Sequence, residues 1–129
     1  MSSIQGVGID LCDIGRMEKM TEHETFLARY FTEGERAYLR AKGATAAQSL
    51  AGLFAAKEAV CKALGTGIVF PLKDIEITHT AAGQPAAVLR GEALSRALGG
   101  EMLLSITHEG GMAAAVAIWV TPQPLPAEA

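Results

Sequence analysis

The run from Phe54 to Gly67 (Phe-Ala-Ala-Lys-Glu-Ala-Val-Cys-Lys-Ala-Leu-Gly-Thr-Gly) constrains the fold of this chain more than any other stretch. It is rich in Ala and Leu and has no Pro, and no Gly before Gly65, so it predicts a helix that ends at that glycine. Successive helical residues turn by about 100°, which gathers the apolar side chains of this region on one broad arc. The arc consists of Leu50, Leu53, Phe54, Val60, Cys61 and Leu64.

The charged residues of this helix differ in their place relative to the arc. Glu58 and Lys62 lie together at its edge, one turn apart, an arrangement that most often forms a solvated helix pair. Lys57 projects from the middle of the arc, where a charge is costly unless it is paired. Beyond the helix, Gly65 either serves only as a C-cap or begins a small-residue turn over residues 65–67 whose backbone N–H groups approach an anion.

Composition indicates a single globular domain. The chain has 129 residues, of which 50% are hydrophobic and 19% charged, values typical of folded proteins. We expect one domain over residues 1–120 and a disordered tail over residues 121–129, which contain three prolines. The net charge of −3 provides no basic field for nucleic acid, which we exclude as a partner.

The sequence also predicts a cytoplasmic protein with no membrane partner. The N-terminus lacks the basic and apolar regions of a signal peptide. The longest apolar run, over residues 112–120, is too short to span a bilayer. Cys12 and Cys61 are isolated and have no metal-ligand spacing, so we expect reduced thiols.

The first part of the chain predicts a strand followed by a helical segment. Ile and Val nearly alternate over residues 4–11, which favours a strand, and the glycines within it indicate close backbone approach. A helical segment is expected over residues 14–20, and residues 26–31 form a second segment, which is apolar and aromatic. Asp13 is expected to cap the first of them. Asp10, near the end of the strand, either caps as well or has a functional role.

Two capping signatures precede the central helix. Thr32 and Glu35 have the capping-box spacing and begin a helix that ends at Gly43. The same spacing recurs at Thr45 and Gln48 and predicts the start of the long helix.

After Gly67 the pattern changes to alternation, which predicts mostly strands. The expected elements are strands over 74–79 and 86–89, a helix over 91–98, and a hairpin of strands over 102–107 and 112–120. The last strand is apolar on both faces, so we place it centrally in its sheet. The predicted fold is therefore α+β, with an antiparallel or mixed sheet packed against the long central helix. His108 ends the first hairpin strand and is of functional interest only if that end converges with Glu58 and Asp10.

Several stretches match one known family in the same order along the chain. They are Gly8-Ile-Asp10 with Arg16, Phe31-Thr-x-x-Glu35, the run from Phe54 to Gly67, Asp74-Ile-Glu-Ile, Gly83-x-Pro85 and Ser105-Ile-Thr-His108. Together they resemble the short, single-domain 4′-phosphopantetheinyl transferases, the holo-acyl-carrier-protein synthase family. The resemblance extends over residues 4–120, and the central run is its most specific part.

The resemblance implies a fold of the 4′-phosphopantetheinyl transferase type and a reaction of fatty acid (lipid) biosynthesis. The 4′-phosphopantetheine arm of coenzyme A moves to a serine of apo acyl carrier protein, and 3′,5′-ADP leaves. Such phosphoryl transfer depends mainly on positioning and charge neutralisation. By resemblance, Asp10 and Glu58 bind magnesium, or manganese, together with the coenzyme A diphosphate. Lys62 donates to that diphosphate, and Glu58 takes the serine proton directly or through a metal-bound water.

The resemblance also assigns binding residues and an assembly. Gly65, Thr66 and Gly67 would let the coenzyme lie against the backbone, and His108 would contact the nucleotide portion or the reacting phosphate. Arg16 would dock the acidic carrier protein by a charge-steered contact. The family's short members are homotrimers with the site between adjacent subunits.

This chain departs from the family pattern in three places. Leu53 stands where the family usually has an Arg that helps to hold the nucleotide. Residues 18–24, in the docking segment, are more acidic than usual, and residues 68–73 lack the usual basic residue near their start and are more apolar.

These departures leave two alternatives to the transferase. A non-catalytic module of the same fold would bind coenzyme A or a carrier protein without turnover, and Leu53 favours it. A hydrolase that uses Glu58 and His108 is disfavoured, because no nucleophile elbow or metal-ligand His cluster is present. By resemblance, Lys57 either pairs with a carboxylate or reaches phosphate.

Overall fold

The computed structural model describes residues 2–122 and has an α+β architecture. A three-stranded antiparallel sheet has the order β1-β5-β4, and a two-stranded antiparallel sheet pairs β2 with β3. The elements are β1 (Ser2–Asp13), α1 (Ile14–Met17), α2 (Glu24–Tyr30), α3 (Glu33–Arg40), α4 (Ala46–Ala63), β2 (Ile75–His79), β3 (Pro85–Leu89), α5 (Gly91–Arg96), β4 (Glu101–Glu109) and β5 (Met112–Pro122). Both sheets are antiparallel, which resolves the antiparallel-or-mixed alternative.

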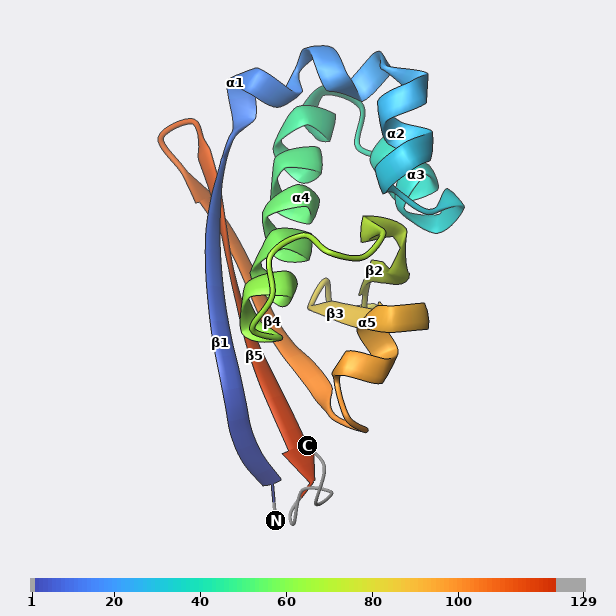
Figure 1. Cartoon of the computed structure of the whole chain (residues 1–129). Coiled ribbons are helices and arrows are strands. Elements are labelled where there is room, and N and C mark those ends of the chain that lie inside the picture. The colour runs from blue at the N-terminus through green and yellow to red at the C-terminus, as the bar shows by residue number, and fades with distance from the viewer. Residues whose placement is uncertain (1, 123–129) are drawn as a thin grey trace.

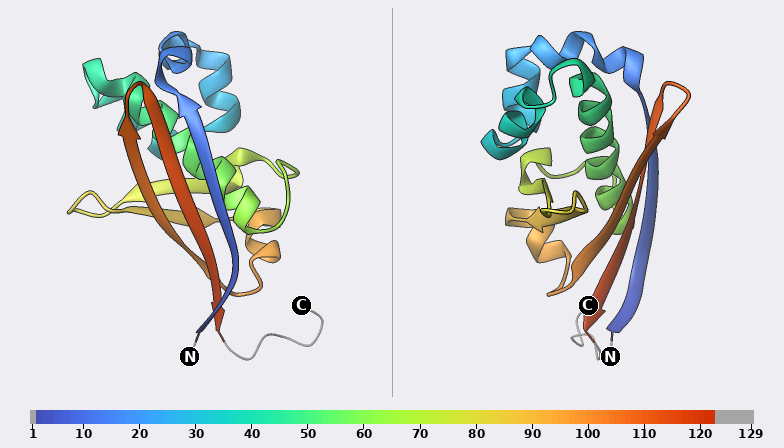
Figure 2. Two further views of the ribbon diagram at one scale, coloured as in Figure 1. Left: turned by 90° about the vertical axis from the view of Figure 1, so that its left-hand side faces the viewer. Right: turned by 180° about the vertical axis from the view of Figure 1, so that it is seen from behind.

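Helix α4 is the centre of the molecule (Figure 1). It lies along one face of the three-stranded sheet, while α3 and β2 contact it from the opposite side. Figure 2 shows α1 and α2 gathered at one end of α4 and the β2–β3 hairpin crossing it near the middle. The predicted arrangement of a sheet packed on a long helix is confirmed.

Strand β5 is the central strand of its sheet, as its apolar pattern predicted. Ala113, Ala115, Ala117 and Trp119 are buried, and the residues between them are only half-buried. The small alanines allow α4 to lie close to the sheet, since an alternating strand directs every second side chain to the helix.

Strand β1 packs on α4 through glycine. A Cβ atom built on Gly8 would overlap the carbonyl oxygen of Ala59, and one built on Gly6 would overlap that of Ala63. Any side chain at these positions would push β1 off the helix, so the close approach predicted from the strand's glycines is confirmed. This contact brings the end of β1 against the polar edge of α4.

Helices α1 and α3 begin where the sequence predicted, and both end earlier than predicted. Asp13 caps α1, whose predicted extent to residue 20 is divided into α1 and a 3₁₀ turn over Lys19–Glu22. The capping box of Thr32 and Glu35 is present in full. The prediction of a second box at Thr45 is wrong: its hydroxyl donates to the Lys42 carbonyl, because a 3₁₀ turn leads directly into α4.

The last strand runs to the end of the described residues. Strand β5 pairs with β1 up to Pro122, opposite Ser2, so the strand passes the predicted domain end at residue 120. The rest of the predicted tail, residues 123–129, lies outside the described residues. Over residues 2–122, no helix is both long and apolar enough to cross a membrane.

Candidate active site

One line of side chains interrupts the burial of α4. From Leu50 to Leu64 every residue is buried except Phe54, Glu58 and Lys62, which follow one another at four-residue intervals. Residues spaced by four lie above one another on a helix, so the three form a single stripe. Lys62 is the most exposed of them, with 53% of its side chain accessible.

The stripe meets the end of β1. The ammonium Nζ of Lys62 donates to the Asp10 carboxylate at 3.0 Å and to the Ile9 carbonyl oxygen at 2.9 Å. The Asp10 side chain is only 14% exposed. The structure therefore brings Asp10, Glu58 and Lys62 together from sequence positions about fifty residues apart, and the question left open for Asp10 is decided against a simple capping role.

Two carboxyl groups share this small volume, and the pKa of Glu58 responds to it. Partial burial raises the pKa of Glu58 to about 7, and a hydrogen bond with Asp10 and the Asp10 charge act in the same direction. The charges of Lys62 and Arg16 oppose the rise in this pKa. Two carboxylates that lie side by side in a partly desolvated place repel each other unless a cation or a proton joins them.

The donor set suits a hard divalent cation. Asp10 and Glu58 supply carboxylate oxygens, the ligands that magnesium and manganese prefer. Among residues 2–122, no group of three or more His, Cys, Asp or Glu side chains is arranged to hold a metal by itself. Magnesium typically takes one or two protein carboxylates and completes its shell with water and substrate phosphate, so the pair of Asp10 and Glu58 fits such an ion.

Arg16 lies beside this cluster. Its backbone N–H is capped by Asp13, and its guanidinium contacts the Cys12 sulfur at 3.9 Å. Its positive charge reaches Glu58, whose pKa it lowers. Burial raises the pKa of the Cys12 thiol, consistent with a reduced thiol. Both cysteines are free, as predicted.

The turn after α4 is a helix C-cap. Gly65 has a φ of 79°, its N–H donates to the Lys62 carbonyl, and the Thr66 N–H donates to the Cys61 carbonyl. This is the Schellman pattern. The expectation that backbone N–H groups of this turn meet an anion is therefore not met by Gly65 and Thr66, because the helix end already uses both donors. Arg96 of α5 braces the turn by donating to the Leu64 carbonyl at 3.1 Å.

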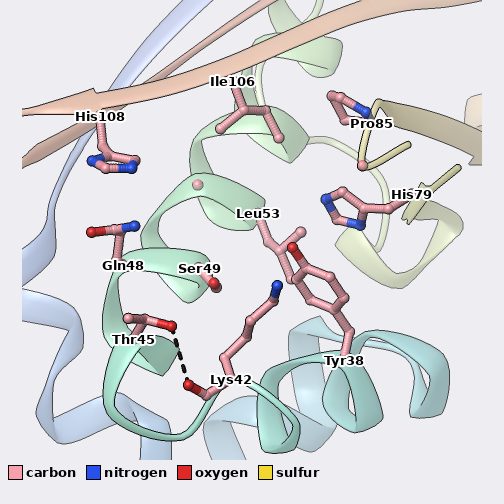
Figure 3. Close-up of a pocket in the computed structure, with 12 residues that line it drawn as sticks. Tyr38, Lys42, Thr45, Gln48, Ser49, Leu53, His79, Pro85, Ile106 and His108 are labelled. Carbon is pink, nitrogen blue, oxygen red and sulfur yellow. Dashed lines mark hydrogen bonds between the residues drawn. The ribbon is translucent and has the colours of Figure 1, made fainter. Parts of the chain in front are cut away.

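His108 does not converge with the cluster. It lies on β4, which is separated from β1 by β5, and it lines a cavity of about 270 Å³ on the other side of α4 (Figure 3). The functional interest of His108 depends on that convergence. Within one copy of the chain the polar cluster and the His108 cavity are two separate places.

The cavity contains residues that the sequence did not single out. Tyr38 of α3 and His79 of β2 stack with ring centroids 4.2 Å apart and nearly parallel planes. The ammonium of Lys42 lies 4.6 Å from the Tyr38 ring centre and points into the cavity (Figure 3). No motif connects these residues, since three different segments supply them. Leu53, where the family usually has Arg, lines the same cavity and is only 2% exposed.

Lys57 has the carboxylate partner that was one of its two predicted alternatives. Its Nζ donates to Glu35 at 2.8 Å and to the carbonyl oxygens of Leu72 and Ile75 at 2.9 and 2.7 Å. Both side chains of the ion pair are fully buried. Lys57 is thus a structural residue that joins α4 to α3 and β2.

Comparison with known proteins identifies the family. Residues 6–117 match the family described as the 4′-phosphopantetheinyl transferase superfamily. The chain belongs to that superfamily. Among curated proteins, it is 44% identical to the holo-[acyl-carrier-protein] synthase of Caldicellulosiruptor bescii, over 89% of this chain and 97% of the relative. It is 48% identical to the synthase of Chlamydia trachomatis, over 88% and 97% of the two chains.

Solved structures agree in fold. The synthase of Bacillus anthracis in complex with coenzyme A (3′,5′-ADP) has a TM-score of 0.78 at 34% identity, covering 92% of this chain and 98% of its own. The synthase of Helicobacter pylori in complex with coenzyme A has a TM-score of 0.76 at 33% identity, covering 89% and 99%. The predicted fold class and the family resemblance are confirmed.

Proposed function

We propose that this chain transfers the 4′-phosphopantetheine group of coenzyme A to a serine of apo acyl carrier protein, giving holo carrier protein and 3′,5′-ADP. The observation that carries the proposal is the meeting of Asp10, Glu58 and Lys62 at one edge of α4, in a chain of the 4′-phosphopantetheinyl transferase superfamily. Two carboxylates and a lysine are the groups that diphosphate chemistry requires: a cation site and a donor to the leaving phosphate.

Asp10 and Glu58 would hold the divalent cation, magnesium or manganese. Bound there, the cation would supply charge neutralisation to the diphosphate of the coenzyme. The raised pKa of Glu58 supports this assignment, because a cation between the two carboxylates would relieve their repulsion.

Lys62 and Glu58 have two further roles: Lys62 stabilises the leaving group, and Glu58 accepts the serine proton. Lys62 is exposed and holds its ammonium group next to the cation site, so it donates to the diphosphate and stabilises the charge that develops on the leaving group. Glu58 is half-buried beside Asp10 at the edge of α4, and its carboxylate would accept the serine proton directly or through a metal-bound water.

The backbone of the C-cap turn forms a surface against which the coenzyme lies. Gly65 and Gly67 have no side chain, and Thr66 lies between them, so an extended ligand approaches the backbone without obstruction. Arg16, beside the cluster and exposed, is placed to meet an acidic carrier protein as it delivers its serine.

The separation of the polar cluster from His108 supports a homotrimeric assembly with composite sites. The face of the sheet that points away from α4 carries exposed apolar side chains, among them Ile4, Val7, Ile9, Leu11 and Leu103, each 52–70% exposed. Exposed apolar area of this kind marks an interface. We infer that copies of the chain associate through this face, so that the His108 cavity of one copy meets the Asp10, Glu58 and Lys62 of the next and receives the nucleotide end of the coenzyme.

Intact-mass spectrometry tests the function directly. Apo acyl carrier protein incubated with this protein, coenzyme A and magnesium is expected to gain the mass of one phosphopantetheine, and a chelator is expected to prevent the gain. Glu101→Gln, an exposed carboxylate on the far end of β4, serves as the matched control for Glu58→Gln. If the folded protein modifies none of several carrier proteins, the transferase assignment is wrong, and titration with coenzyme A would then test for the non-catalytic binding module.

A further inference from the structure

Two side chains complete an open edge of strand β2. Along its other edge β2 pairs with β3, and over residues 2–122 no strand pairs with this one. Here the Ile77 N–H donates to Glu35 at 2.8 Å, and the Ile75 carbonyl accepts a hydrogen bond from Lys57 at 2.7 Å. The carboxylate and the ammonium thus take the places of the carbonyl and N–H groups that a third strand would offer.

The ion pair of Lys57 and Glu35 also joins the segments around β2. The ammonium of Lys57 donates to the Leu72 carbonyl at 2.9 Å, in the 3₁₀ turn (Leu72–Asp74) that leads into the strand. Glu35 lies in the first turn of α3 and accepts the Thr32 N–H at 2.8 Å. One buried pair therefore links α3, α4 and the start of the β2–β3 hairpin by directional bonds.

Stability alone does not explain a buried ion pair at this place. Both side chains are fully buried, and burial lowers the pKa of Lys57, with the Glu35 charge opposing this shift. Removing two charges from water costs so much that apolar side chains of similar volume often stabilise a fold equally well. Apolar side chains would leave the Ile77 N–H and two carbonyls without partners, and their contacts do not fix the position of a strand along its neighbour. The ion pair thus determines where the hairpin lies.

The hairpin carries part of the wall of the His108 cavity. His79, at the end of β2, and Pro85, at the start of β3, line this cavity. Ser49 and Leu53 of α4 contribute another part of the lining (Figure 3). Because the lining comes from two separate elements, the shape of the cavity depends on the distance between the hairpin and α4.

We propose that Lys57 and Glu35 are positioning residues, which hold the β2–β3 hairpin at the distance from α4 that coenzyme binding requires. The inference rests on the proposed function, in which this cavity receives the nucleotide end of the coenzyme. Neither side chain touches the ligand, since both are fully buried and neither lines the cavity. They act through the hairpin that they hold.

The split between KM and kcat tests the proposal. Lys57→Met removes three donors, and Glu35→Gln turns an amide nitrogen towards one of the donors that the carboxylate accepts. Each variant is expected to raise KM for coenzyme A about tenfold, because a displaced binding wall costs affinity. We expect kcat and KM for the carrier protein to change less than about twofold, since the groups at the edge of α4 are unaltered.

Leu50→Ala is the matched control. Leu50 is fully buried in α4 and does not line the cavity, so its truncation destabilises the fold without removing a bond to the hairpin. Urea denaturation measures the stability of all the variants, and their kinetics are compared at a temperature at which each is folded. Leu50→Ala is expected to keep the wild-type KM for coenzyme A.

A role in stability alone would give a different result. If Leu50→Ala raises KM for coenzyme A as much as the other two variants do, or if those two keep the wild-type KM, the proposal is overturned while the proposed function stands. Failure of both Lys57→Met and Glu35→Gln to fold would also overturn it, because the pair would then be required for folding itself.

A binding measurement separates this proposal from the proposed function. If the wild-type protein transfers nothing, the proposed function fails, and calorimetric titration with 3′,5′-ADP still tests the positioning role. Wild type and Leu50→Ala are then expected to bind 3′,5′-ADP equally well, and Glu35→Gln about tenfold more weakly. Equal affinities in all three proteins, or no binding by the wild type, would contradict the positioning role.

Discussion

Helix α4 contributes a lysine to each of two clusters of lysine and carboxylate, a buried cluster of Lys57 with Glu35 and an exposed cluster of Lys62 with Asp10 and Glu58. Lys57 and Glu58 are neighbours in sequence, yet Lys57 enters the core and Glu58 faces the edge of β1. Lys57 pairs with Glu35, and Lys62 pairs with Asp10, at nearly equal distances of 2.8 and 3.0 Å. The two clusters differ in how many hydrogen-bonding groups each has left for a ligand.

In the buried cluster of Lys57 and Glu35, the lysine has no hydrogen-bond donor left for a ligand. The three donors of the Lys57 ammonium meet three acceptors, and Glu35 also accepts the N–H groups of Thr32 and Ile77 at 2.8 Å each. The exposed cluster is incomplete: Lys62 pairs with Asp10 and makes no ion pair with Glu58 among the described residues, and the pKa of Glu58 rises to about 7. A saturated charge cluster stabilises the fold, whereas an unsaturated one is available for chemistry.

The largest effect is expected when the exposed cluster loses a carboxylate. Glu58→Gln is expected to lower phosphopantetheine transfer by about 10³-fold, since it removes both a cation ligand and the proton acceptor. The rate of holo carrier protein formation measures this. Transfer at the wild-type rate by Glu58→Gln would remove Glu58 from both roles.

The corresponding change in the buried cluster is expected to affect folding. Lys57→Met leaves the Glu35 carboxylate buried without its counter-ion and is expected to lower the free energy of unfolding by about 3 kcal/mol. Lys62→Met is the matched control at the exposed cluster, where loss of the ion pair costs less than about 1 kcal/mol. Urea denaturation of the two variants measures the contrast, and equal destabilisation would show that burial is not what distinguishes them.

The exposed cluster is expected to reduce stability above neutral pH. Because the folded-state pKa of Glu58 is raised from 4.5 to about 7, the protonated carboxyl stabilises the fold below pH 4.5, and this contribution is lost as the pH rises through 7. In metal-free buffer, the stability of Glu58→Gln relative to wild type is therefore expected to increase between pH 5 and pH 8, by about 1 kcal/mol after allowance for solvent screening. Chemical denaturation at the two pH values measures it; a pH-independent difference would mean that the two carboxyl groups do not interact.

Magnesium is expected to reverse this destabilisation. At pH 8, addition of magnesium raises the melting temperature of the wild-type protein and has less effect on Glu58→Gln, since an ion that binds the folded state stabilises it. Differential scanning fluorimetry measures the shift. Identical shifts in both proteins would place the ion elsewhere.

The smallest effect on the transfer rate is expected from Arg16, which lies beside the exposed cluster. Arg16→Ala is expected to lower kcat/KM for the carrier protein about fivefold, mainly through slower association, and to weaken its dependence on salt. Glu18→Gln, an exposed change on the same segment, serves as a comparison. If the dependence of the rate on carrier concentration stays as in wild type, Arg16 has no docking role.

Local patterns predicted most of the secondary structure. Of the polar cluster, they predicted that Glu58 and Lys62 lie one helical turn apart. The apolar arc of α4, the capping box at Thr32 and the central position of β5 all depend on interactions between residues near in sequence or on alternation along one strand. The second capping box failed because Thr45 uses its hydroxyl on the Lys42 carbonyl. Sequence spacing shows which hydrogen bonds are available and leaves open which of two competing bonds forms.

The sequence by itself determined the α+β class, the central helix, the family resemblance, and the positions of Glu58 and Lys62 one turn apart. Only the tertiary structure decided that Asp10 joins them, because the contact depends on two glycines that let β1 lie against α4. It also decided that Lys57 is structural and that Lys42, Tyr38 and His79 share a cavity with His108. Such contacts join segments far apart along the chain, where helical and strand periodicity carry no information about distance.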